Sequence, residues 1–222
     1  MQLAIFDLDN TLIGGDSDHA WGEFLVERNH VDVARYRSAN DRFLRDYQRG
    51  ELDIFAYLEF ALEPLAQLSR SQLDNLHREF MNEVISEIWL PGAEALIGRH
   101  RRQGRHIMII TATNRFVAEP IATRLGVDTL LATEPELVED RYTGRVVGEP
   151  CYQAGKVARL HRWLAENPEF SAEEKWFYSD SINDLPLLEQ VENPVAVDPD
   201  ARLKEEALKR GWPVISLREM DA

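Results

Sequence analysis

Short apolar runs that alternate with helical patterns are the feature that most limits what this chain can fold into. The apolar runs lie at residues 3–6, 105–111, 176–179, 194–197 and 213–216. A short apolar run bounded by polar residues is typical of a strand buried on both faces, as in a parallel sheet. The segments between them have helical spacing, and they lie at residues 92–102, 116–125, 156–166, 185–191 and 201–209. This alternation predicts an α/β fold whose parallel strands are joined by right-handed crossovers.

Residues 15–89 depart from this pattern, because they contain no strand-like run and their apolar residues fall at helical spacing. Asp32, Asp53 and Ser71 are candidate helix N-caps, and the sequence from Ser71 to Asp74 resembles a capping box. We therefore expect three or four helices inserted after the first strand.

The predicted domains are an α/β core formed by residues 1–14 and 90–222, and a helical insertion formed by residues 15–89. Within the core, residues 137–147 are expected to form an excursion that contains half of a small hairpin.

Acidic residues and a hydroxyl follow the ends of the predicted strands. Asp7 and Asp9 follow the first apolar run, Thr111 ends the second, and Asp180 and Asp184 follow the third. In an open α/β sheet, ligands bind at the carboxyl ends of the strands. If these strands are neighbours, the four carboxylates and the hydroxyl converge on one edge of the sheet. Lys156, at the start of a predicted helix, joins them.

Four clustered carboxylates need a counter-charge, because nearby carboxylates raise one another's pKa. Mg²⁺ supplies it, since this ion takes oxygen ligands from carboxylates, water and substrate phosphate. One carboxylate can then attack phosphorus as a nucleophile, and a second can act as general acid and base. Lys156 and the Thr111 hydroxyl would bind the oxygens of the transferred phosphoryl group.

These residues resemble the four ordered motifs of the haloacid dehalogenase superfamily. The motifs are Asp7-x-Asp9-x-Thr11, then Thr111, then Lys156, and finally Asp180-x-x-x-Asp184. The insertion at residues 15–89 is similar to the type-one cap of phosphoserine phosphatase and its relatives. The resemblance implies a Rossmann-like, mostly parallel sheet core with an inserted α-helical cap.

The resemblance also implies a role for each residue. Asp7 is the nucleophile and Asp9 the general acid and base, and an acid at position 9 favours phosphoryl over haloacid chemistry. Asp7, the backbone carbonyl of Asp9, and Asp180 bind Mg²⁺. Thr111 and Lys156 hold the phosphate. Asp184 and Asn183 support the water shell of the metal.

The sequence departs from typical phosphoserine phosphatases in two motifs. It has Thr111-Ala112-Thr113 where they have Ser-Gly-Gly, and Ser179-Asp180-Ser181 where they have Gly-Asp-Gly. Asp16 stands where they carry a glutamate that meets the substrate amine. The pattern is similar to a bacterial subgroup that acts on amino-alcohol phosphates. We therefore expect a small, amine-bearing phosphorylated metabolite such as histidinol phosphate, with phosphoserine as the alternative.

Two of the substrate assignments have competing interpretations. Asp16 and Asp18 could serve only as N-caps for a helix that begins near His19. His19 is a further candidate for substrate binding, although a lone histidine is more often structural. Trp21 and Phe24 fit the core of the insertion better than a stacking surface for substrate.

Charge and cysteine content exclude several classes of protein. The chain has 25 basic and 39 acidic side chains, a formal net charge of −14, and a pI near 4.9. This balance argues against nucleic acid or an anionic membrane surface as partner. The single Cys151 excludes an internal disulfide and a zinc site of several thiolates. The N-terminus lacks the pattern of a signal peptide, and no uncharged run exceeds nine residues; a cytoplasmic location is expected.

Two other classes of function remain open at this point. A phosphorylation-controlled signalling module also combines an acidic Mg²⁺ pocket with a hydroxyl and a lysine, but Asp9 and the long insertion argue against it. A phosphoryl-transfer enzyme such as a mutase would not release inorganic phosphate from most of the substrate that it consumes.

Overall fold

A computed structural model describes residues 1–170 and 174–218. Within these residues a seven-stranded sheet has the order β4-β3-β2-β1-β5-β6-β7, and all neighbours are parallel except β3 and β4. The strands are β1 (Leu3–Phe6), β2 (His106–Asn114), β3 (Thr129–Val138), β4 (Arg141–Val147), β5 (Lys175–Ser179), β6 (Asn193–Val197) and β7 (Val214–Ile215). The strands β2 to β4 lie on one side of β1 and the strands β5 to β7 on the other. The strand order therefore reverses at the central strands, which is the topological switch point. The α/β fold predicted from the sequence is confirmed.

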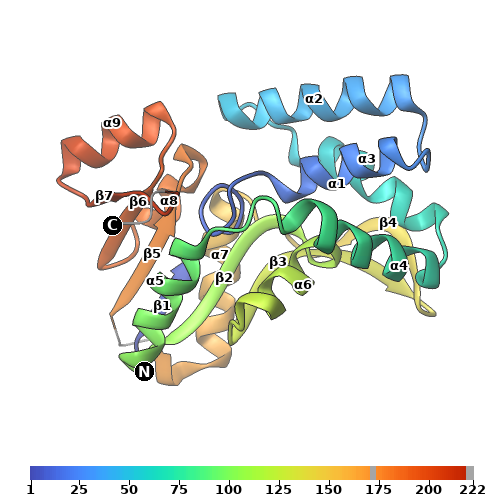
Figure 1. The fold of residues 1–222 in the computed structure, drawn as a ribbon. Helices are drawn as coiled ribbons and strands as arrows, with labels where there is room; N and C mark the ends of the chain where they lie inside the picture. Colours follow the sequence, from blue (N-terminus) through green and yellow to red (C-terminus); the bar gives the residue numbers. More distant parts are fainter. Residues whose placement is uncertain (171–173, 219–222) are drawn as a thin grey trace.

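Helices cover both faces of this sheet (Figure 1). One face packs against α5 (Pro91–Arg102) and α6 (Arg115–Leu125), and the other against α7 (Ala154–Glu166), α8 (Leu185–Leu188) and α9 (Ala201–Arg210). Successive β1 residues alternate between the two cores: Ala4 and Phe6 belong to one, and Leu3 and Ile5 to the other. Because both faces of β1 are buried, all of its residues are apolar, and the strand is a continuous apolar run in the sequence.

The helical cap lies between β1 and α5 along the chain. Its helices are α1 (Ser17–Glu27), α2 (Val33–Arg49), α3 (Ile54–Gln67) and α4 (Arg70–Phe80), and a π-helical segment (Met81–Ile85) follows them. Trp21 and Phe24 are 2% exposed and pack with Phe80, which confirms them as core residues. Figure 1 shows α1, α2 and α3 together beyond the end of the sheet at which β2 leads into α6.

Side-chain caps define the cap helices, with one difference from the prediction. Asp32 and Asp53 accept hydrogen bonds from backbone amides at the starts of α2 and α3, as expected. The prediction for Ser71 is wrong, because Ser69 is the N-cap of α4. The Ser69 and Gln72 side chains each bond to the backbone of the other residue, which places the capping box two residues earlier than predicted.

The predicted hairpin excursion corresponds to the antiparallel pair β3 and β4. The pair begins earlier in the chain than the predicted residues 137–147, because β3 starts at Thr129. There it pairs with β2 inside the sheet. Within the residues that the structure describes, no helix is long and apolar enough to cross a membrane.

Candidate active site

The register of the three central strands brings the predicted residues together. Phe6 of β1 pairs with Ile109 of β2 on one side and with Tyr178 of β5 on the other. Asp7, Thr111 and Asp180 follow these residues at the same edge of the sheet. The convergence expected from the sequence is therefore present.

Lys156 forms two buried ion pairs at the centre of this edge. Its ammonium lies 2.7 Å from an Asp7 oxygen and 2.8 Å from an Asp184 oxygen, and Ser179 donates to the same Asp184 oxygen at 2.7 Å. Burial lowers the pKa of Lys156, but the Asp184 and Asp7 carboxylates outweigh burial and hold this pKa above its ordinary value. The Lys156 ammonium therefore stays charged.

A glycine places Lys156 in the first turn of α7. A Cβ atom at Gly155 would lie 2.0 Å from the Pro150 carbonyl oxygen, so only glycine allows this close approach. The tight turn before α7 directs Lys156 toward the sheet edge, where its side chain is 2% exposed.

Asp9 is held by three hydrogen bonds to its two oxygens. The Ser17 backbone amide and hydroxyl donate to one oxygen at 2.6 and 2.5 Å, and the Thr113 hydroxyl donates to the other at 2.5 Å. Burial and the nearby Asp16 raise the pKa of Asp9 to about 6, although these hydrogen bonds oppose the shift. A carboxyl group with a pKa near neutrality suits general acid and base catalysis.

Ser17 and Thr113 are site residues that the sequence analysis missed. Thr113 lies two residues after Thr111 on β2, so the two side chains share one face of the strand. That spacing was the available signal for Thr113. Ser17 begins α1, and its contact with Asp9 depends on how the cap meets the core. Thr111 itself accepts a hydrogen bond from the Thr113 amide at 3.1 Å.

Asp180 is anchored by Thr11 of the first motif. The Thr11 hydroxyl donates to an Asp180 oxygen at 3.2 Å, and the Asp180 backbone amide donates to the Thr11 hydroxyl at 3.0 Å. Burial, Asp7 and Asp184 raise the pKa of Asp180 well above its ordinary value. Asp7 is affected in the same way, because burial, Asp184 and Asp9 raise its pKa to about 7 despite the opposing effect of Lys156.

This donor set fits a magnesium ion. The buried carboxylates of Asp7 and Asp184 both contact the Lys156 ammonium, and the half-buried Asp180 lies close enough to act on Asp7 and Asp184 electrostatically. The pKa values of Asp7 and Asp180 are raised, so this group of carboxylates lacks positive charge. A divalent cation with carboxylate oxygens as ligands would supply it.

Asn183 lies in the motif that runs from Asp180 to Asp184, and its side-chain amide contacts the cap. It donates to the Tyr47 carbonyl of α2 at 2.9 Å and accepts from Gln153 at 3.2 Å. Arg202 makes a parallel contact, because its guanidinium donates to the Arg49 carbonyl at 2.9 Å. The C-terminal end of α2 is thus joined to the core at two points.

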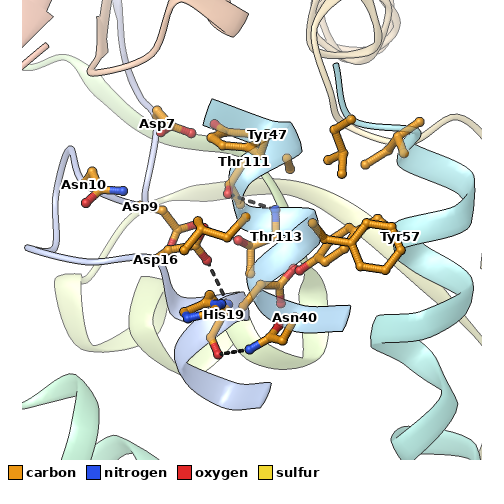
Figure 2. Close-up of a pocket in the computed structure, with 16 residues that line it drawn as sticks. Asp7, Asp9, Asn10, Asp16, His19, Asn40, Tyr47, Tyr57, Thr111 and Thr113 are labelled. Carbon is orange, nitrogen blue, oxygen red and sulfur yellow. Dashed lines mark hydrogen bonds between the residues drawn. The ribbon is translucent and has the colours of Figure 1, made fainter. Parts of the chain in front are cut away.

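A cavity extends from Asp7 and Asp9 into the cap. The cap contributes most of its wall, and the residues with side chains there include Asp16, Asp18, His19, Asn40, Phe43, Leu44, Tyr47, Leu52, Ile54 and Tyr57. Figure 2 shows Asp7, Asp9 and Asp16 on one side of the view and Tyr57 on the other. Among the residues that the structure describes, no lysine or arginine lines this cavity.

Asp16 is the N-cap of α1 and also lines the cavity. Its carboxylate accepts from the His19 backbone amide at 2.9 Å. Burial raises its pKa. His19 lines the cavity too, its ring 3.8 Å from Asp41, and Asn40 donates to its carbonyl at 2.9 Å (Figure 2).

Comparison with known proteins gives one family. The model of the haloacid dehalogenase-like hydrolases matches residues 4–189. A histidinol-phosphatase from Neisseria meningitidis serogroup C is 47% identical over 219 residues, which cover 97% of this chain and 99% of that protein. The phosphoserine phosphatase SerB1 of Mycobacterium tuberculosis is 35% identical over 218 residues, which cover 97% of this chain and 70% of that protein.

Solved structures agree on the fold. A Bordetella pertussis protein of unknown function superposes with a TM-score of 0.90 at 43% identity and covers 97% of this chain and 98% of its own. A phosphoserine phosphatase in a phospho-aspartyl intermediate analogue form superposes with a TM-score of 0.71 at 19% identity. The match covers 99% of this chain and 94% of the phosphatase chain. At that identity the second likeness concerns the fold alone.

Proposed function

The chain belongs to the haloacid dehalogenase-like hydrolase family and is a phosphatase, and on this premise we propose that it hydrolyses histidinol phosphate through an aspartyl-phosphate intermediate with Mg²⁺ as cofactor. The charge of the cavity is the observation that carries the choice of substrate. Four carboxylates line it, those of Asp7, Asp9, Asp16 and Asp18, and no lysine or arginine does among the described residues.

This charge separates the two candidate substrates by their chemistry. Phosphoserine carries a carboxylate beside its ammonium group, and a buried carboxylate needs a cationic partner. Histidinol phosphate carries the ammonium and an imidazole but no carboxylate. A cavity that places Asp16 beside the catalytic carboxylates, and has no lysine or arginine among the described residues that line it, therefore favours histidinol phosphate. The 47% identical Neisseria relative, named a histidinol-phosphatase, supports the same choice.

In the proposed reaction an Asp7 oxygen attacks phosphorus, and the bond from phosphorus to the ester oxygen breaks. Asp9 gives its proton to that leaving oxygen, which departs as the amino alcohol. Asp9 then takes a proton from water, the water oxygen attacks phosphorus, and inorganic phosphate leaves as Asp7 is regenerated. The hydrogen bonds from Ser17 and Thr113 hold Asp9 in position for both proton transfers.

Lys156 and Thr111 would bind the oxygens of the phosphoryl group during both steps. Asp7, the Asp9 carbonyl and Asp180 would hold Mg²⁺, with Asp184 and Asn183 supporting its water shell. When bound, Mg²⁺ neutralises charge on the phosphate and on the surrounding carboxylates. The helical cap, residues 15–89 in the predicted domain division, would exclude water and select the leaving group.

A kinetic comparison of histidinol phosphate, phosphoserine and several sugar phosphates tests the substrate. We expect the highest kcat/KM for histidinol phosphate, with inorganic phosphate released stoichiometrically. A higher value for phosphoserine would replace the proposal with phosphoserine phosphatase activity. Phosphate release from only a minor part of the consumed substrate would indicate a phosphoryl-transfer enzyme instead.

The Asp16→Asn variant tests the proposed ammonium site. We expect KM to rise about 10- to 100-fold for histidinol phosphate, the range set by a hydrogen bond to a charged group. The KM for p-nitrophenyl phosphate, which has no amine, should change much less. Equal increases for both substrates would limit Asp16 to its role as the N-cap of α1.

A further inference from the structure

Resting on the proposed function, we propose that Asp18 and Tyr57 form a second specificity site, which binds the imidazole ring of the substrate while Asp16 binds its ammonium group. Asp18 lies in the first turn of α1 and Tyr57 on α3, and both line the cavity that begins at Asp7 and Asp9. The two residues therefore meet where the cap faces the end of the sheet.

The Asp18 carboxylate is fixed in place by two side chains from different parts of the fold. The Asn114 amide, at the end of β2, donates to one of its oxygens at 2.8 Å, and the Tyr57 hydroxyl donates a further hydrogen bond. An ionised carboxylate can accept about four hydrogen bonds. Asp18 thus has capacity left for a donor from a ligand, and its position does not depend on that ligand.

The wall around Asp18 suits a flat ring. The Phe43 and Tyr57 rings meet edge to face, with centroids 5.5 Å apart and planes at 69°, and Leu52 and Ile54 extend the apolar surface. Aromatic rings favour such offset or edge-to-face neighbours, and an imidazolium is attracted to their faces. An imidazole placed here would bury its carbons on this wall and donate an N–H to Asp18.

Asp16 and Asp18 line the same cavity as Asp7 and Asp9. Histidinol phosphate presents its phosphate, then its ammonium and then its imidazole along one short chain. Phosphate at Asp7, ammonium at Asp16 and imidazole at Asp18 follow that order.

A purely structural role explains Asp18 poorly. An acid in the first turn of a helix interacts with the helix dipole favourably only in its charged form. Burial instead raises the pKa of Asp18 well above its ordinary value, and Asp16 and Asp9 raise it further. Burial therefore disfavours the Asp18 charge, and a cationic or N–H-donating ligand would offset that cost.

A pair of substrates and a matched variant test the inference. 2-Aminoethyl phosphate keeps the phosphate and ammonium of histidinol phosphate and lacks the imidazole. We expect Asp18→Asn to lower the ratio of kcat/KM for histidinol phosphate to kcat/KM for 2-aminoethyl phosphate about 10- to 100-fold. The loss should come mainly from KM. Asp74→Asn, which removes an exposed carboxylate from α4, should leave this ratio unchanged.

The outcomes separate this inference from the proposed function. If Asp18→Asn keeps the ratio of the two kcat/KM values within about threefold of wild type, the imidazole site is overturned. Histidinol phosphate then remains the proposed substrate. A wild-type enzyme with no preference for histidinol phosphate over 2-aminoethyl phosphate overturns both. If Asp18→Asn does not fold, Tyr57→Phe gives the same readout, because it removes one donor to Asp18 and keeps the ring. A selective loss in Tyr57→Phe supports the inference, and an unchanged ratio contradicts it.

Discussion

The side-chain amide of Asn183 lies 2.9 Å from the backbone carbonyl oxygen of Tyr47, and this hydrogen bond joins the end of α2 to the loop that carries Asp180 and Asp184. The last carbonyls of a helix have no donors within the helix. Asn183 and Arg202 supply such donors from the core, to Tyr47 and Arg49. The position of the cap is therefore coupled to the residues proposed to bind the metal.

Arg202→Ala should loosen the end of α2 without changing a proposed metal ligand. Loss of a hydrogen bond worth about 1 kcal/mol predicts roughly fivefold faster amide hydrogen exchange in the last turn of α2. Hydrogen–deuterium exchange with mass spectrometry measures this, with Lys204→Ala on the same helix α9 as the matched control. Exchange equal to wild type in residues 46–50 would contradict a stabilising role for the contact.

Asp7→Asn should abolish turnover and leave the protein folded. The variant removes the proposed nucleophile, yet its amide oxygen can still accept from Lys156. It also relieves repulsion among carboxylates that share one ammonium, so we expect a Tm in EDTA no lower than that of wild type. Thermal unfolding and phosphate release measure the two effects. Near-normal activity in folded Asp7→Asn would exclude Asp7 as the nucleophile.

Removal of Mg²⁺ should eliminate activity, and its return should restore activity and raise Tm. A ligand that binds only the folded state stabilises it by about 2.7 kcal/mol at 100 times its Kd. Asp180→Asn should weaken this Mg²⁺-dependent rise in Tm, whereas Asp74→Asn should retain it. A full rise in Asp180→Asn would place the metal elsewhere.

His100 should make the stability of the protein depend on pH. The Tyr178 hydroxyl lies 2.8 Å from its Nε2, and the Arg105 guanidinium lies 3.0 Å from its Nδ1, so a proton on Nδ1 would face a cation. Burial, Arg105 and Arg99 lower the pKa of His100 to about 4, from an ordinary value of 6.5. Between these values the unfolded chain binds the proton and the folded one does not, so stability falls as pH falls from 6.5 to 4.

Urea unfolding of His100→Asn between pH 7.5 and pH 4.5 measures this contribution. The free energy of unfolding of the variant should fall less steeply with pH than that of wild type. His161→Asn, which changes an exposed histidine on α7, should keep the wild-type slope. Equal slopes in wild type and His100→Asn would show that His100 does not titrate in this window.

The catalytic edge of the sheet could be predicted from the sequence because each buried strand ends abruptly in polar residues. The runs that end before Asp7 and Asp180 are apolar on both faces, so their boundaries are sharp. β3 gave no such signal. Its second half contains Glu134, Pro135 and Glu136, and it pairs with β4 at the edge of the sheet, where its side chains are half-buried or exposed.

Residues that contact the site from distant or inserted segments were hidden for a different reason. Ser17 and Thr113 donate to Asp9 from segments that lie 8 and 104 residues away from it along the chain. The Ser17 hydroxyl has no charge and no distinctive spacing, so only the fold identifies it as a donor to Asp9, whereas the spacing of Thr113 from Thr111 was a signal for Thr113. Asn183 lies within a recognisable motif, but its contact with Tyr47 depends on where α2 ends.

The two walls of the cavity come from different parts of the chain, and this separation makes the enzyme a favourable scaffold for engineering. The proposed reacting groups lie on the ends of β1, β2 and β5 and the start of α7, whereas α2 and α3 supply Phe43, Leu44, Ile54 and Tyr57. A library randomised at those four positions would vary the leaving group that is accepted, while the phosphoryl chemistry stays constant.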